Sequence, residues 1–188
     1  MRIAGGALGG RTLHAPDDAR VRPTSDKARQ AIFNILAHGA AALDLEGAAV
    51  IDLFAGTGAL GLEAISRGAA FCLFVDDAAE SRALIRRNVE EFGLTGASKI
   101  WRRDATSLGP LAAGSGGPFA LAFLDPPYRK GLIAPALASL RDGGWLAPGA
   151  IVVTEAAAEE EGPAADGFTT LDSRLYGETR VSFLSAAS

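Results

Sequence analysis

Cysteine is nearly absent from this chain of 188 residues, which contains only Cys72. One thiol forms no intrachain disulfide and no cysteine metal cluster, so both frameworks are excluded. Cys72 lies in the apolar run 71–75, and we interpret it as a small buried side chain. No apolar run approaches the roughly 20 residues that cross a bilayer, and the first residues lack the apolar core of a signal peptide. We therefore expect a cytoplasmic protein with no membrane partner and no metal.

Positive charge is also scarce. The net charge is −4, which argues against broad affinity for nucleic acids. The N-terminus is the exception, because residues 1–30 carry six basic and three acidic side chains, a local charge of +3, and the remainder carries −7. We interpret the acidic group Glu155, Glu159, Glu160 and Glu161 as a solvated loop. A surface that binds phosphate is therefore expected to involve the N-terminus.

The pattern from residue 49 onward is that of βαβ units, in which short apolar runs alternate with amphipathic stretches. We expect strands at 49–54, 71–76, 98–103, 119–124 and 148–154, and helices at 59–67, 79–92, 105–112 and 132–141. Two further runs, 168–175 and 179–184, predict an antiparallel hairpin that closes the sheet. The expected fold class is α/β, with a mainly parallel, doubly wound sheet.

Residues 1–40 follow a different pattern. Arg2-Ile3-Ala4 and Arg11-Thr12-Leu13 flank several glycines and predict a small hairpin. A helical pattern begins after Thr24 and Ser25, either of which can cap it. This segment is too small for a core of its own. We therefore expect an N-terminal arm at 1–40 that packs on a main domain at 41–188.

A glycine-rich loop follows the strand at 49–54. It satisfies the pattern G-x-G-x-x-G with Gly56, Gly58 and Gly61. Asp76 lies 20 residues after the first of these, where an acid that binds ribose belongs. A nicotinamide or flavin cofactor is one interpretation, but the preceding Asp52 directs negative charge to the place where a pyrophosphate would sit. S-adenosylmethionine fits better, since it carries an amino group and a sulfonium but no phosphate.

Asp125-Pro126-Pro127-Tyr128 follows the apolar run 119–124 and carries the most chemical information. The prolines fix the backbone and make a rigid shelf after the strand. The carboxylate and the Pro126 carbonyl can accept hydrogen bonds from an exocyclic amine, while Tyr128 stacks on a base. Taken alone, two prolines equally well mark an ordinary loop.

Acids also follow the other predicted strands. Asp104, followed by Ala105, comes after the third strand and can reach the amine of an adenine, or it can cap the helix expected at 105–112. The carboxyl ends of parallel strands form one crevice in a doubly wound sheet. The glycine loop, Asp76, Asp104 and the shelf are therefore expected to converge on a single site.

These motifs resemble those of S-adenosylmethionine-dependent methyltransferases that act on exocyclic amino nitrogens. More narrowly, the chain resembles the bacterial 16S ribosomal RNA (guanine(966)-N2)-methyltransferase family. The narrower resemblance depends on residues 2–6 and 10–11, and on the segment 22–36, which opens Arg22-Pro23-Thr24-Ser25-Asp26-Lys27. It covers nearly the whole chain. This chain departs from the family pattern at two positions: Asp76 is shorter than the usual glutamate, and Ala78 stands in place of an acid. We expect these departures to affect the affinity for the cofactor and not the reaction type.

The resemblance implies a Rossmann-like class I methyltransferase fold and methyl transfer to N2 of a guanine in 16S ribosomal RNA, in an assembling 30S subunit. An adenine-N6 methyltransferase remains the alternative, although 188 residues leave little room for the target-recognition region usual in those acting on DNA. Catalytic roles are expected for Asp125, Pro126 and Tyr128. Cofactor contacts are expected from Asp52, Phe54, Gly56, Thr57, Gly58, Asp76, Asp104 and Ala105. RNA contacts are expected from Arg11, Arg22, Lys27, Arg29 and Pro127, and Arg22 can instead brace the arm against the shelf.

Overall fold

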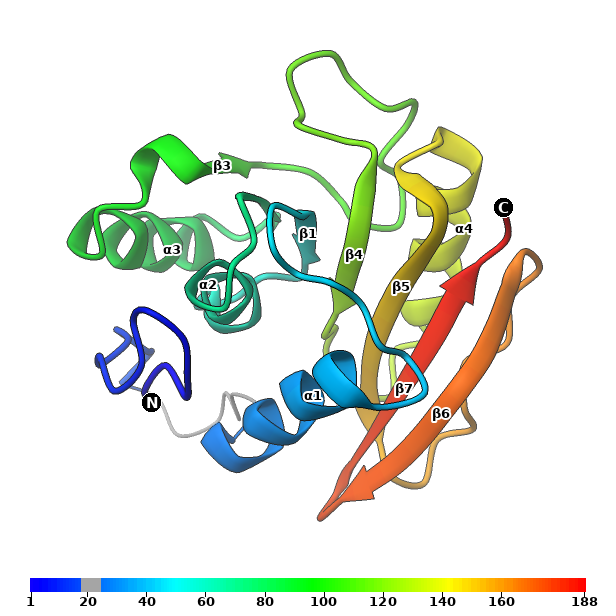
Figure 1. The fold of residues 1–188 in the computed structure, drawn as a ribbon. Helices are drawn as coiled ribbons and strands as arrows, with labels where there is room; N and C mark the ends of the chain where they lie inside the picture. Colours follow the sequence, from blue (N-terminus) through cyan, green and yellow to red (C-terminus); the bar gives the residue numbers. More distant parts are fainter. Residues whose placement is uncertain (18–24) are drawn as a thin grey trace.

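A seven-stranded sheet runs through the molecule in the order β3-β2-β1-β4-β5-β7-β6 (Figure 1). The computed structural model describes residues 1–17 and 25–188. In chain order the elements are α1 (Asp26–His38), β1 (Ala49–Leu53), α2 (Ala59–Ser66), β2 (Phe71–Val75), α3 (Ala79–Glu91), the 3-10 turn η1 (Thr95–Ala97), β3 (Ser98–Trp101), β4 (Phe119–Leu124), α4 (Ile133–Gly143), β5 (Leu146–Ala157), β6 (Phe168–Tyr176) and β7 (Thr179–Ala186).

The strand pairing confirms a doubly wound sheet with a C-terminal hairpin. Strands β1 to β5 pair in parallel, whereas β7 pairs antiparallel with both β5 and β6. The chain runs from β1 outward to β2 and β3 and then returns to β4 on the other side of β1. Ligands of open α/β sheets bind where the strand order reverses in this way, outside the carboxyl ends of the strands.

Two apolar cores cover the two faces of the sheet, because successive strand residues point to opposite faces. Val50 contributes to the core shared with α1, α2 and α3, and its neighbour Ile51 contributes to the core shared with α4. Figure 1 shows α1 and α4 on opposite sides of the sheet. No helix in the described ranges is long and apolar enough to cross a membrane.

The helix expected at 105–112 is not formed, which corrects that prediction. Pro110 lacks a backbone N–H, and Gly109 adopts a positive φ of 72°. The backbone groups of this segment bond to its surroundings instead: Leu108 N donates to Ser139 Oγ at 2.7 Å, and the Gly109 carbonyl accepts the Trp145 indole N–H at 2.8 Å. An irregular segment therefore packs beside α4, with Leu108 buried in the second core.

The N-terminal arm docks on the sheet through the first core. Its small hairpin is present as one antiparallel bridge between Arg2 and Thr12. Ser25 caps α1 by accepting the Ala28 N–H at 3.1 Å, while Thr24 lies outside the described residues. Ile3, Leu13 and apolar residues of α1 belong to the same buried cluster as strand residues of β1 and β4. The arm thus contributes to the core of the main domain, and the boundary at residue 40 stays a prediction.

Glu63 of α2 fixes the arm in place. Its fully buried carboxylate accepts the backbone N–H groups of Ala4 at 2.7 Å and Gly5 at 3.2 Å. The same carboxylate pairs with Arg29 of α1 at 3.3 Å and with Arg67 at 3.4 Å. One side chain therefore joins the hairpin, α1 and α2.

Candidate active site

The predicted acids lie at one edge of the sheet. Asp52 is the penultimate residue of β1, Asp76 directly follows β2, and Asp125 directly follows β4. The register pairs Leu53 with Leu124, so Phe54 and Asp125 directly follow the last paired residues of these two neighbouring strands. The glycine loop, Asp76 and the shelf therefore begin at the carboxyl ends of three neighbouring strands, at the β1–β4 switch point. Convergence of Asp104 on the same site stays a prediction.

The glycine loop has the conformation that its sequence requires. Gly56 and Gly58 adopt positive φ angles of 57° and 80°, which residues with a Cβ rarely adopt. Phe54 also has a positive φ, 54°, at the start of the loop. For a bulky residue this is strain of order 1–3 kcal/mol, and such strain clusters at ligand sites.

Asp76 shapes this loop from the neighbouring strand. Its Oδ2 accepts the Gly56 N–H at 2.9 Å, and its Oδ1 accepts the Ala78 N–H at 2.9 Å. Each carboxylate oxygen has a second lone pair that can accept a ribose hydroxyl. Ala78, noted as a departure from the family pattern, thus contributes a backbone donor that needs no acidic side chain.

Asp52 lies behind the loop rather than in the open crevice. It is 1% exposed, and its Oδ2 accepts the Gly61 N–H at 3.0 Å. Burial raises the pKa of this carboxyl, the bond from Gly61 opposes the shift, and the charges of Asp125 and Asp76 add to it. Asp52 therefore acts on a ligand indirectly, by fixing the position of the glycine loop.

Gly61 brings α2 close to β2. A Cβ at this position would lie 2.5 Å from the Phe74 ring and 2.6 Å from Cys72 Sγ. The third glycine of the pattern is therefore required for close packing of helix against strand. Cys72 is fully buried, as predicted, and burial raises the pKa of its thiol.

Asp104 is exposed and forms a turn rather than a helix cap. Its Oδ1 accepts the Thr106 N–H at 2.9 Å and contacts the Thr106 hydroxyl at 2.7 Å, and these bonds lower the pKa of the carboxyl. The interpretation as an N-cap is wrong, because no helix follows. Ala105 is buried in the second core. A contact of either residue with an adenine stays a prediction.

The shelf emerges from the end of β4. Asp125 is half-buried, Pro126 is buried and Pro127 is exposed. The Tyr128 hydroxyl lies 2.9 Å from Thr179 Oγ1 at the start of β7. Burial raises the pKa of this phenol to about 12, partly offset by the bond to Thr179. The ring is therefore neutral at physiological pH and tethered at its hydroxyl end.

The predicted RNA contacts divide into three groups. Arg11 and Lys27 are exposed, and Arg11 lies with its guanidinium 4.6 Å from the centre of the Phe92 ring. Arg22 lies outside the described residues. Arg29 corrects the prediction, because it is fully buried and paired with Asp26 at 2.7 Å and with Glu63. A contact between Arg29 and an RNA backbone is not possible in this arrangement.

Asn88 is a residue that the sequence reasoning missed. It is fully buried in α3, and its Oδ1 accepts the His14 N–H at 2.8 Å. Its Nδ2 donates to the carbonyls of His14 at 3.1 Å and Thr57 at 3.0 Å. Asn88 therefore links the arm to the glycine loop. The available signal was its position on the apolar face of α3, beside Ile85 and Val89.

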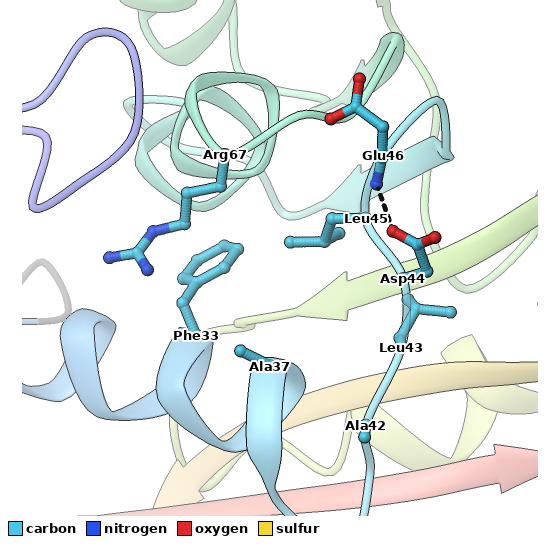
Figure 2. A pocket seen from close by; sticks show the side chains of 8 residues that line it. All are labelled: Phe33, Ala37, Ala42, Leu43, Asp44, Leu45, Glu46 and Arg67. Carbon is cyan, nitrogen blue, oxygen red and sulfur yellow. Dashed lines mark hydrogen bonds between the residues drawn. The ribbon is translucent and has the colours of Figure 1, made fainter.

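A pocket of about 590 Å³ lies between the second half of α1 and the segment before β1 (Figure 2). Phe33, Leu45 and Arg67 are among its lining residues. Of the predicted site residues that the structure describes, none lines it. It opens near the amino end of β1, away from the carboxyl edge that holds the acids. Within the described ranges, no group of three His, Cys, Asp or Glu side chains is arranged to hold a metal ion.

Comparisons with known proteins agree with this arrangement. The family model "Conserved hypothetical protein 95" matches residues 1–185. The chain is 39% identical over 160 residues to "Ribosomal RNA small subunit methyltransferase D" of Escherichia coli K12, covering 85% of this chain and 76% of that protein. It is 33% identical to "Putative rRNA methyltransferase YlbH" of Bacillus subtilis, over 96% of both chains. The solved structure "Putative methyltransferase yhhF from Escherichia coli" superposes with a TM-score of 0.83 at 29% identity, covering 100% of this chain and 98% of that one.

Proposed function

Because this chain belongs to the family described as Conserved hypothetical protein 95, we propose that it methylates the exocyclic N2 of a guanine in 16S ribosomal RNA. The observation that carries this proposal is the position of Asp125-Pro126-Pro127-Tyr128. It directly follows β4 at the switch point, beside the glycine loop that follows β1.

The cofactor is S-adenosylmethionine, which supplies a methyl group activated by its sulfonium. The residues at the switch point fit this molecule. The glycine loop leaves its backbone open to close approach at Gly56, and Asp76 offers carboxylate lone pairs to a ribose. Asp125 adds negative charge that favours a cation over a pyrophosphate, and Asp52 supports the site through the glycine loop that it holds. We assign Phe54, Thr57, Gly58, Asp104 and Ala105 to the rest of the cofactor surface.

Asp125 and the Pro126 carbonyl orient the amine. The lone pair of an exocyclic amine is delocalised into the ring, so the nitrogen is a weak nucleophile. Two acceptors that hold its N–H groups direct the lone pair out of the ring plane. Orientation of this kind supplies a large part of the acceleration when the leaving group is already activated. Asp125 takes up a proton only as the new bond forms, so it requires no raised pKa.

Tyr128 and Pro127 hold the base itself. Extrusion of a guanine from its stack costs a few kcal/mol. Stacking of the extruded base on an aromatic ring offsets part of this free energy. The half-buried Tyr128 ring is tethered at its hydroxyl, so it presents a face in a fixed position. Pro127 is exposed beside it.

The RNA context is the small ribosomal subunit during assembly, which places the reaction in the cytoplasm. The E. coli relative is named for the small subunit, and the basic segment of this chain lies in the N-terminal arm. Exposed Arg11 and Lys27 supply charge for phosphate contacts. Arg22 is assigned to the same surface from the sequence alone.

The test is methyl transfer from labelled S-adenosylmethionine to small subunits isolated from cells that lack this protein. Mass spectrometry of the digested RNA identifies the product. We expect N2-methylguanosine with the wild-type protein and none with Asp125→Ala, which should still bind the cofactor. N6-methyladenosine would replace the proposal by the adenine alternative. Transfer that survives Asp125→Ala would refute the mechanism.

A further inference from the structure

Tyr128 is held from two directions, and both anchors belong to the end of the β5–β7 ladder. On one side its hydroxyl lies 2.9 Å from Thr179 Oγ1. On the other side the next residue, Arg129, donates its backbone N–H to Glu160 Oε1 at 3.0 Å. The second oxygen of Glu160 accepts the Ala157 N–H at 2.6 Å. Ala157 and Thr179 are register partners, so both anchors reach the same pair of residues.

Glu160 is itself fixed by the backbone around it. Its N–H donates to the Ala157 carbonyl at 3.0 Å, and its carbonyl accepts Arg180 Nε at 3.1 Å. These two bonds and the bond from the Ala157 N–H tie Glu160 to the end of β5 and the start of β7. Glu160 therefore imposes a position on Arg129, the residue next to the shelf tyrosine.

The backbone of Arg129 also needs an anchor. Its φ of 62° lies in the left-handed region, which residues other than glycine, asparagine and aspartate rarely adopt. Such a conformation persists where surrounding contacts determine it, and it occurs often beside functional sites. The bond from Glu160 is one of these contacts, and the ion pair between Arg129 and Glu159 is another. Both partners of that ion pair are more than half exposed, so it contributes little.

We propose that Glu160 is a positioning residue of the methyltransferase site, which together with Thr179 sets the orientation of the Tyr128 ring. This inference rests on the proposed function, in which the Tyr128 ring stacks on the target base. The acidic loop after β5 is thus part of the catalytic architecture through one of its glutamates. Glu159 and Glu161 are not required for it.

The test compares Glu160→Gln with the matched control Glu161→Gln, which removes the same charge from an exposed neighbour. Glutamine retains one acceptor, so only one of the two N–H bonds survives. We expect kcat for methyl transfer to fall by about 10- to 100-fold, since small misplacements of a reacting group have effects of that size. The cofactor Kd, the KM for the RNA and the melting temperature should stay close to wild type. Glu161→Gln should match wild type in every measurement.

A second readout follows the ring directly. The chain contains two tyrosines, so fluorotyrosine labelling of a Tyr176→Phe background leaves one ¹⁹F resonance, from Tyr128. Glu160→Gln should move this resonance toward its position in the unfolded protein, and Glu161→Gln should leave it in place. An unchanged resonance, or an unchanged kcat, in Glu160→Gln overturns the proposal. If the wild-type protein transfers no methyl group to any small subunit, the proposed function fails, and the resonance alone then decides whether Glu160 positions the ring.

Discussion

Replacement of Glu63 by Gln tests whether the arm is held by one buried charge network. The substitution preserves the size of the side chain but removes its charge and one acceptor oxygen. It removes the α2 carboxylate beside the fully buried Arg29 guanidinium, and it takes away the acceptor of one of the two N–H groups of Ala4 and Gly5. Breaking a buried ion pair by removing one partner costs about 3–5 kcal/mol.

We expect a loss near the lower end, about 3 kcal/mol, because glutamine still accepts one hydrogen bond and Asp26 remains beside Arg29. In a domain of this size each kcal/mol lowers Tm by about 2–4 °C, so the expected shift is about 6–12 °C. Urea denaturation gives the free energy of unfolding, and differential scanning calorimetry gives Tm. Glu46→Gln, at an exposed position, is the control.

A double-mutant cycle makes this prediction specific. In an Arg29→Met background there is no buried guanidinium to leave uncompensated, so Glu63→Gln should cost less there. The difference should be at least about 0.5 kcal/mol and as much as about 3 kcal/mol for groups in direct contact. A cost below about 1 kcal/mol for Glu63→Gln in the wild-type background, or equal costs in both backgrounds, would refute the reasoning.

Three further predictions concern the glycine loop and its supports. Gly61→Ala should destabilise the protein by about 1–3 kcal/mol through overpacking against β2, measured by urea denaturation; a neutral result would contradict the close contact of α2 with β2. Because the folded-state pKa of Asp52 is raised, it contributes stability at acidic pH that is lost as the pH rises through that pKa. Asp52→Asn should remove this decline from a plot of Tm against pH, and an unchanged plot would mean that Asp52 titrates normally. Asn88→Ala should weaken cofactor binding measured by calorimetry, since the Thr57 carbonyl loses its donor; Asn34→Ala, at an exposed position, should not, and equal effects would rule out a role for Asn88.

The sequence predicted the sheet and the strand-end acids because each signal is local. Asp76 and Asp125 stand directly after apolar runs, so their place at the carboxyl edge follows from the strand boundaries. The irregular segment 105–112 was wrongly predicted as a helix. Apolar residues at helical spacing suggested it, but the Gly109-Pro110 pair and the bonds to α4 and Trp145 determine the structure.

Long-range partners explain the remaining differences. Arg29 was interpreted as an RNA contact because its partner Glu63 lies 34 residues away. The overlooked local signal was its place on the apolar face of α1, three and four residues before the buried Ile32 and Phe33. Glu155 and Glu160 were interpreted as residues of a solvated loop, which is wrong: Glu155 is buried within β5, and Glu160 accepts a hydrogen bond from Arg129, 31 residues away. Both errors treat a charge as exposed, since a sequence displays charges but not the folded backbone that surrounds them.

The shared core of the arm has a consequence for synthesis on the ribosome. Ala4 bonds to a side chain 59 residues further along the chain, and His14 to one 74 residues further along. Ala4 and His14 therefore lack these particular native partners until α2 and α3 have been synthesised. Domains generally fold as units during translation. The contacts of the N-terminal hairpin with α2 and α3 form only after nearly half of the chain has been synthesised. A truncated product that ends before residue 88 would lack the bonds between Asn88 and His14.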